Sequence, residues 1–165
     1  MNWRRRMAWK MKTDGLEEVE KMLGQMAEKA HGAAAGALYE GAGIMAAEVQ
    51  KSAEQISTAP FKYTRDGTRM PSPEEKEIVL NASAGIAKFG DQNGGVDTSV
   101  GYRNAGYAEL AGKTRPIPVI VNSINSGTSF MKTQPFVRKA AKTGGQKAIA
   151  AMKAYIENAY EEMNK

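Results

Sequence analysis

The sequence predicts an α+β fold in which a long N-terminal helix and a C-terminal helix pack on a small antiparallel sheet, with a long mobile loop. Three observations predict this fold. Apolar residues recur every three or four positions over residues 14–53 and 135–163, which is the helical period. Apolar and polar residues alternate on either side of Asn93-Gly94, as in a β-hairpin. Residues 54–72 are rich in turn formers and charges, which predicts the loop.

The length of 165 residues is that of one domain. We expect residues 1–13 to form a basic N-terminal arm with an edge strand, and residues 14–165 to form a single α+β domain. The apolar content is 42%, but only 7% of residues are aromatic, so alanine and methionine supply much of the core. Small side chains bury little area each, and we therefore expect partner subunits to supply part of the stabilisation.

The net charge of +5 is a property of the N-terminal arm. Residues 1–12 contain five basic residues and no acidic one, so the rest of the chain is neutral overall. A domain that wraps nucleic acid is expected to carry its own basic excess. The basic and aromatic residues of the arm are candidate interface residues: Trp3, Arg4, Arg5, Arg6 and Trp9. Two tryptophans favour an arm that binds a neighbouring protein; contact with DNA and a solubilising tail remain alternatives.

The residue types argue against catalysis and metal binding. The sequence has no cysteine and one histidine, His31, so thiolate sites and metal sites built from several histidines of one chain are excluded. Asp91 begins a calcium-like loop, but Tyr102 stands where a bidentate glutamate is required. Gly112-Lys113-Thr114 lacks the preceding glycine of a phosphate-binding loop, because position 107 is Tyr107. We expect no enzyme, no cofactor and no membrane-spanning segment.

The first half of the chain contains two further helix starts and one strand pattern. Residues 7–12 alternate in polarity and predict a short strand. Asp14 begins a capping-box-like sequence, and the helix after it has a Gly- and Ala-rich middle around Gly32. That composition favours close backbone packing, a kink or a break. Ser72-Pro-Glu-Glu75 is a second capping box and predicts a helix over residues 73–82.

In the second half, Gly85–Phe89 and Val96–Tyr102 are the strands of the expected hairpin, and residues 103–115 are expected to be loop. Residues 117–126 are ambiguous: their β-branched residues favour a strand, whereas Pro116, Pro118 and Gly127 suit the ends of a helix. Thr133 is a candidate cap for the last helix, with Pro135 in its first turn.

Residues 126–140, SGTSFMKTQPFVRKA, resemble the signature near the end of the Hong Kong ninety-seven gene-product-ten-like family of tailed-phage tail and neck proteins. The Gly15–Glu18 start of the long helix and the segment from Gly85 to Tyr102 agree with that family. The chain departs from it at Asn125-Ser126, where the family often has an acidic or aromatic pair, and at Lys139, where proline is usual. Residues 64–72 replace a Thr-Gly-x-Leu segment.

The resemblance implies a structural virion protein at the head–tail junction or tail end, which completes the tail or joins it to the head. It implies a homo-oligomeric ring, commonly hexameric, and no catalysis. The implied partners are a head-closure or connector protein and a tail terminator or major tail protein, in the neck or tail of the virion and in the host cytoplasm during assembly. It also favours a short helix over residues 117–126. The alternative function is a small nucleic-acid-binding domain that uses the basic arm.

Two further groups of candidate residues follow. Apolar residues in polar loops either fold back on the core or contact a partner, and a ring subunit favours contact. These candidate interface residues are Phe61, Tyr63, Phe130 and Met131. The crossing between the last two helices is expected to set the angle of the C-terminal helix. The residues of this structural joint are Gly127, Thr128, Pro135, Phe136 and Arg138.

Overall fold

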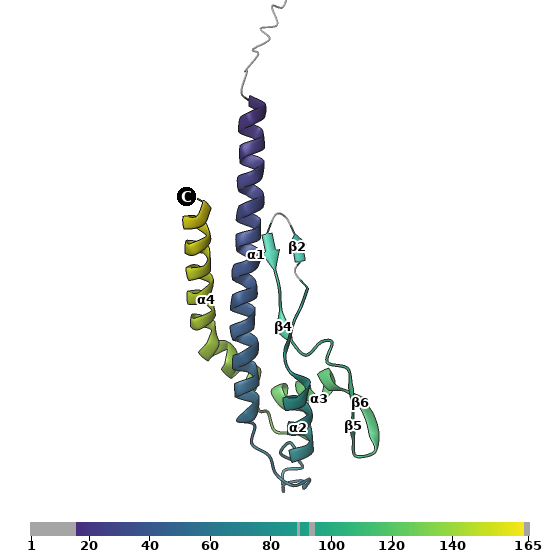
Figure 1. Ribbon diagram of the computed structural model, residues 1–165. Coiled ribbons are helices and arrows are strands. Elements are labelled where there is room, and N and C mark those ends of the chain that lie inside the picture. Colours follow the sequence, from purple (N-terminus) through teal and green to yellow (C-terminus); the bar gives the residue numbers. More distant parts are fainter. Residues whose placement is uncertain (1–15, 89, 93–94, 164–165) are drawn as a thin grey trace, which may run out of the picture.

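The computed structural model describes residues 16–163 apart from 89 and 93–94, and it confirms the α+β fold class (Figure 1). The elements in chain order are α1 (Leu16–Glu54), α2 (Pro73–Ala82), β1 (Gly85–Ile86), β2 (Gly90–Gln92), β3 (Gly95–Asp97), β4 (Val100–Gly101), β5 (Tyr107–Leu110), β6 (Lys113–Pro116), α3 (Ile117–Ser126) and α4 (Phe136–Met163). The N-terminal arm and the strand expected at residues 7–12 lie outside the described residues.

Helices α1 and α4 run antiparallel and side by side, and α1 extends beyond the C-terminal end of α4 (Figure 1). Of the three alternatives for the glycine-rich middle of α1, a break is wrong, because the helix runs continuously through Gly32. Close packing is found at two other glycines of this region, Gly36 and Gly41. A Cβ atom on Gly41 would lie 2.8 Å from Cγ of Met152, and one on Gly36 would collide with the ring of Tyr155. These two glycines therefore let α4 approach the backbone of α1.

The expected hairpin over residues 85–101 is confirmed. Strand β1 pairs antiparallel with β4, with Ile86 opposite Val100, and β2 pairs antiparallel with β3, with Asp91 opposite Val96. Strands β1, β3 and β4 pack on α1. The Asn93-Gly94 turn lies outside the described residues.

The expectation of a loop over residues 103–115 was wrong. Strands β5 and β6 form a second hairpin, with Leu110 opposite Lys113. The two turn residues, Ala111 and Gly112, have φ of 51° and 71°. Positive φ at both central residues is typical of the tight turns that match strand twist, but such turns usually contain Asn-Gly or Asp-Gly. Alanine at the first turn position concealed the signal.

Residues 117–126 form helix α3, as the resemblance favoured. Pro116 is the N-cap residue, Pro118 lies in the first turn, and Gly127 follows the last turn with φ of 75°. Of the β-branched residues that suggested a strand, Ile120, Val121 and Ile124 instead occupy one buried helical face, together with Ile117. The fourth, Val119, is 52% exposed.

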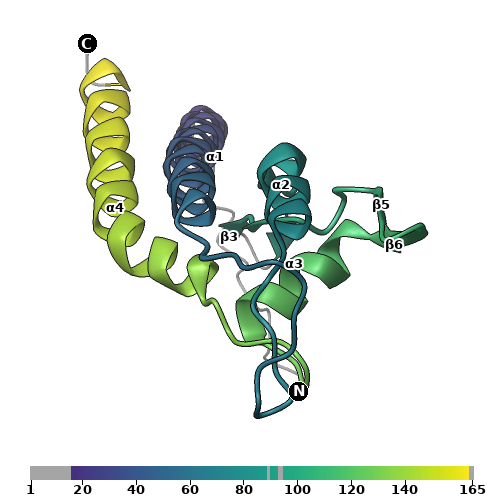
Figure 2. The same ribbon diagram turned by 90° about the horizontal axis from the view of Figure 1, so that it is seen from below.

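The main hydrophobic core lies where the last turns of α1, the start of α4, α2 and α3 meet (Figure 2). We call this part of the molecule, together with loop 55–72, the β5–β6 hairpin and the crossing 127–135, the core end. Its largest fully buried side chains include Phe136, Ile124 and Val79. Residues 21–32 of α1 lie far from this core, and all of them are exposed. Within the described residues, no helix has the length and apolar character needed to cross a membrane.

Candidate functional site

A groove of about 660 Å³ opens at the core end between loop 55–72, the β5–β6 hairpin, α3 and the crossing 127–135. Its walls are mainly apolar. The apolar side chains that line it are Phe61, Tyr63, Leu110, Val119, Ile120, Phe130 and Met131. Several of these side chains are largely exposed, so the groove presents apolar surface to solvent.

The structure brings together all four candidate interface residues that lie within its described part. Phe61 and Phe130 are 65% and 64% exposed, and Tyr63 is 50% exposed, whereas Met131 is buried beneath them. The chain therefore places aromatic rings from two segments, about 70 residues apart, on one surface. Their role as an interface stays a prediction.

Backbone hydrogen bonds hold these two segments side by side (Figure 2). Arg69 N donates to Phe130 O at 2.8 Å, and Lys132 N donates to Arg69 O at 2.9 Å. Ala59 N donates to Pro71 O at 3.0 Å, which closes the loop on itself. The mobility expected of residues 54–72 stays a prediction. Backbone hydrogen bonds nevertheless hold this loop at Ala59 and at Arg69.

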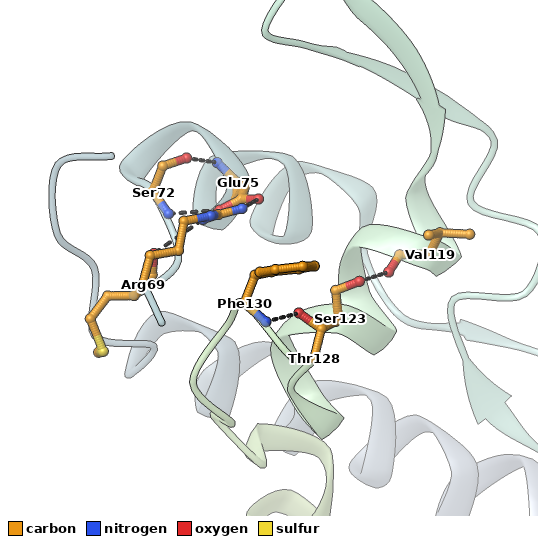
Figure 3. A network of polar contacts seen from close by, with 8 residues as sticks. Arg69, Ser72, Glu75, Val119, Ser123, Thr128 and Phe130 are labelled. Carbon is orange, nitrogen blue, oxygen red and sulfur yellow. Dashed lines mark hydrogen bonds and ion pairs between the residues drawn. The ribbon is translucent and has the colours of Figure 1, made fainter. Parts of the chain in front are cut away.

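Arg69 links the groove to the start of α2 (Figure 3). Its two terminal nitrogens donate to the two carboxylate oxygens of Glu75, each at 2.6 Å, and its guanidinium lies 4.7 Å from the ring centroid of Phe61. The Phe61 ring in turn meets Tyr63 edge to face at 5.7 Å. One cation therefore orders both the α2 cap and the aromatic wall.

Glu75 is also the last residue of the predicted capping box, which is confirmed. Ser72 N donates to Glu75 Oε2 at 2.8 Å, and Glu75 N donates to Ser72 Oγ at 3.1 Å. Burial raises the pKa of Glu75, but the bonds from Arg69 and Ser72 outweigh burial and hold it below its ordinary value. The same pair raises the pKa of Arg69, chiefly through the hydrogen bond to Glu75. Both groups are therefore charged at neutral pH.

The joint between α3 and α4 is a tight turn that begins at Gly127. Thr128 N donates to Met131 O at 3.0 Å. Phe130 N donates to the Thr128 hydroxyl at 3.2 Å, as Figure 3 shows. A Cβ atom on Gly127 would lie 3.1 Å from Met131 O and closer still to the hydroxyl of Thr133. The Gly-Thr pair thus shapes the turn that presents Phe130 to the groove.

Thr133 does not cap α4, and Pro135 precedes its first residue, Phe136. The Thr133 hydroxyl instead donates to Ser126 O at 3.1 Å, across the turn. The side chain of Asn125 takes the capping role, because its Oδ1 accepts from Val137 N at 3.1 Å. A cap supplied by another helix has no local sequence pattern, so the sequence did not reveal it.

The remaining joint residues differ in their environment. Phe136 is 2% exposed, and its ring lies 6.3 Å from that of Tyr102. Its carbonyl oxygen accepts a 2.8 Å hydrogen bond from the hydroxyl of Ser52 on α1. Arg138 is exposed and lies outside the groove lining. The joint therefore has a buried residue, Phe136, and an exposed cation, Arg138, in the first turn of α4.

Among the described residues, four charged ones besides Glu75 line the groove: Arg69, Glu74, Lys113 and Arg115. Arg69 is neutralised by Glu75, and the other three make no ion pair within the described part of the chain. The uncompensated charge of the lining is therefore net positive, with both cations on β6. On the loop outside the groove, hydrogen bonds from Thr64 and Thr68 hold the pKa of Asp66 well below its usual range.

The basic and aromatic candidates of the arm, Trp3, Arg4, Arg5, Arg6 and Trp9, lie outside the described residues. His31 lies on the exposed part of α1, and no group of His, Asp and Glu able to hold a metal ion occurs among the described residues. The sequence missed Val119, Leu110, Lys113 and Arg115 as groove residues. Val119 is the one β-branched residue of α3 that lies off its buried face. That position outside the apolar helical face was the signal in the sequence that could have indicated Val119 as a groove residue.

No family model, curated protein or solved structure matches this chain.

Proposed function

We propose that the chain is a structural subunit of a tailed-phage virion, which forms a ring at the head–tail junction or tail end and joins tail to head. The observation that carries this proposal is the position of the signature-like residues 126–140. They form the α3–α4 joint and one wall of an exposed apolar groove. These residues connect two helices at a fixed turn and present apolar side chains for contact with another protein.

The exposed helix surface supports the same function. Met22, Leu23 and Met26 are 60–64% exposed on the part of α1 that extends beyond α4. Large apolar residues on an unpartnered helix favour contact with another protein, because burial of each contributes roughly 1.5–3 kcal/mol. A subunit with apolar surface at both ends suits an assembly with several contacts per copy.

The test is the mass and shape of particles that the full chain forms, alone and with candidate connector and tail proteins. We expect a ladder of oligomers or a ring by mass photometry and negative-stain imaging. A strict monomer in the presence of those partners would contradict the proposal. Gly127→Val and Pro135→Gly are expected to disturb assembly, and normal rings in both variants would remove the joint from the mechanism.

Nucleic-acid binding through the arm is the second candidate, and the concentration of the net charge in residues 1–12 favours it. Deletion of residues 1–6 is then expected to abolish DNA binding, and binding of the full chain is expected to fall steeply with salt. Salt-independent binding, or binding that survives the deletion, would argue against it.

A further inference from the structure

We propose that the C-terminal end of α4 from one copy docks in the groove at the core end of a second copy. The inference rests on the proposed ring and deepens it, because it names the surfaces that join neighbouring subunits. Two surfaces of opposite charge and similar apolar character carry it, one at each end of the molecule.

The last turns of α4 form an exposed surface of aromatic, aliphatic and acidic side chains. Tyr155, Ile156 and Tyr160 are 39%, 48% and 64% exposed. The acidic residues among them are Glu157, Glu161 and Glu162, and the last turn contains no basic residue. A helix C-terminus is the negative end of the helix dipole, so carboxylates there are destabilising in the isolated subunit. A cationic partner would remove that cost.

The groove offers the complementary chemistry. Its aromatic and aliphatic walls suit tyrosine and isoleucine side chains, and Lys113 and Arg115 stand on its β6 side without ion-pair partners in the described part of the chain. Glu74 opposes them, which leaves a single net positive charge once Arg69 is paired with Glu75. The docking helix is therefore expected to place Glu161 and Glu162 toward β6.

The two surfaces cannot meet within one chain. Figure 1 shows the end of α4 beside the middle of α1, whereas α3 and the β5–β6 hairpin lie at the opposite end. Contact between two different surfaces of identical subunits is heterologous, and repetition of such a contact closes into a ring or extends into a filament. The arrangement thus supplies the kind of contact that a ring requires.

Charge reversal tests the contact. Glu161→Lys/Glu162→Lys changes only the helix end, and Lys113→Glu/Arg115→Glu changes only the groove. Each variant alone is expected to self-associate at least tenfold more weakly than the parent chain by sedimentation velocity. An equimolar mixture is expected to recover association, because each variant's altered surface then faces a complementary one.

Parent-like assembly of both single-surface variants, or a mixture that fails to recover, would overturn the docking contact. If rings persist in those experiments, the proposed function stands and only the contact is wrong. If the parent chain stays monomeric with its tail partners, both proposals fail. Circular dichroism of each variant checks that the fold is intact, and recovery in the mixture excludes misfolding as the cause.

Crosslinking gives an independent measurement, because the natural sequence contains no cysteine. Val119→Cys places a thiol in the groove, and Asn158→Cys places one on the exposed end of α4. A short bis-maleimide is expected to join the two variants into a heterodimer only when they are mixed. Gln146→Cys, on an exposed site nearer the start of α4, is the matched control. Equal crosslinking of the control and Asn158→Cys would contradict the docking geometry.

Discussion

The core end and the part of the α1–α4 pair outside it bury different kinds of side chain. At the core end, the buried residues include Phe136, Ile124 and Met131, and a salt-bridged helix cap ties the loop to α2. Along the α1–α4 pair, the buried residues are Ala37, Ala42 and Ala148, with glycines between the helices. Burial of a methyl group contributes far less than burial of a phenyl ring. The helix backbones thus approach most closely between α1 and α4, whereas the burial that stabilises the fold most is at the core end.

This difference indicates how the parts of the chain are held together. The core end has a hydrophobic cluster that includes Ile124, Met131 and Phe136 on both sides of the joint. The α1–α4 pair fixes its geometry through backbone proximity but leaves large apolar side chains outside, at Leu23, Met26 and Ile156. We therefore expect stability of the isolated chain to depend on the core end and assembly to depend on both.

The largest expected effect is from a cavity at the core end. Phe136→Ala removes a 2% exposed ring and is expected to lower the free energy of unfolding by about 3–5 kcal/mol. Ile156→Ala, on a 48% exposed site of the same helix, is the control and is expected to cost less than about 0.5 kcal/mol. Urea titration followed by circular dichroism measures both, and equal effects would remove the distinction between the two regions.

The next effect is from the Arg69–Glu75 pair, whose side chains are only 12% and 5% exposed. Arg69→Met leaves a carboxylate without its partner and is expected to cost about 3 kcal/mol. Because the folded-state pKa of Glu75 is lowered, its contribution is present above the unfolded pKa of about 4.3 and is lost as pH falls through the folded value. Stability of the parent should fall in acid more steeply than that of Glu75→Gln; identical pH profiles would contradict this.

A smaller effect is expected at the joint. Gly127 has φ of 75°, and its Cβ position is occupied by the turn that follows. Gly127→Ala is therefore expected to cost about 1–3 kcal/mol through backbone strain. Gly67 has φ of 77° with open space around it, so Gly67→Ala measures the conformational part alone. If the two variants lose the same stability, the packing of the turn contributes nothing.

The smallest expected change in stability is at two glycines of α1, one that faces open space and one that packs against α4. Nothing lies within 4 Å of a Cβ atom built on Gly32, so Gly32→Ala is expected to stabilise the helix by about 1 kcal/mol. Gly36→Ala gains the same propensity but collides with Tyr155, so its net gain is expected to be smaller. Thermal unfolding of the pair measures the difference, and a larger gain at Gly36 would show that the contact with Tyr155 is unimportant.

The sequence predicted the elements whose patterns are local. The start of α2 follows from the Ser72–Glu75 capping box, and α1 follows from its apolar period. The hairpin over residues 85–101 follows from alternation around Asn93-Gly94. The helical state of residues 117–126 needed the resemblance, because β-branched residues on a buried helical face have the composition of a strand.

Features that depend on distant residues were not predictable. The cap of α4 comes from Asn125 on another helix, and the β5–β6 hairpin turns at Ala111, which has no turn signature. The sequence indicated Phe61, Tyr63, Phe130 and Met131 only as apolar residues in polar loops. Their meeting depends on backbone pairing between Arg69 and the Phe130 segment, which no periodicity encodes.

The 39 residues of α1 make a rod about 58 Å long, and its residues 21–32 are all exposed. Rotation of such a rod by one degree about its base displaces its far end by about 1 Å. In the ring proposed above, small rotations at the core end would therefore be magnified at the far tip of α1, without any change in the groove.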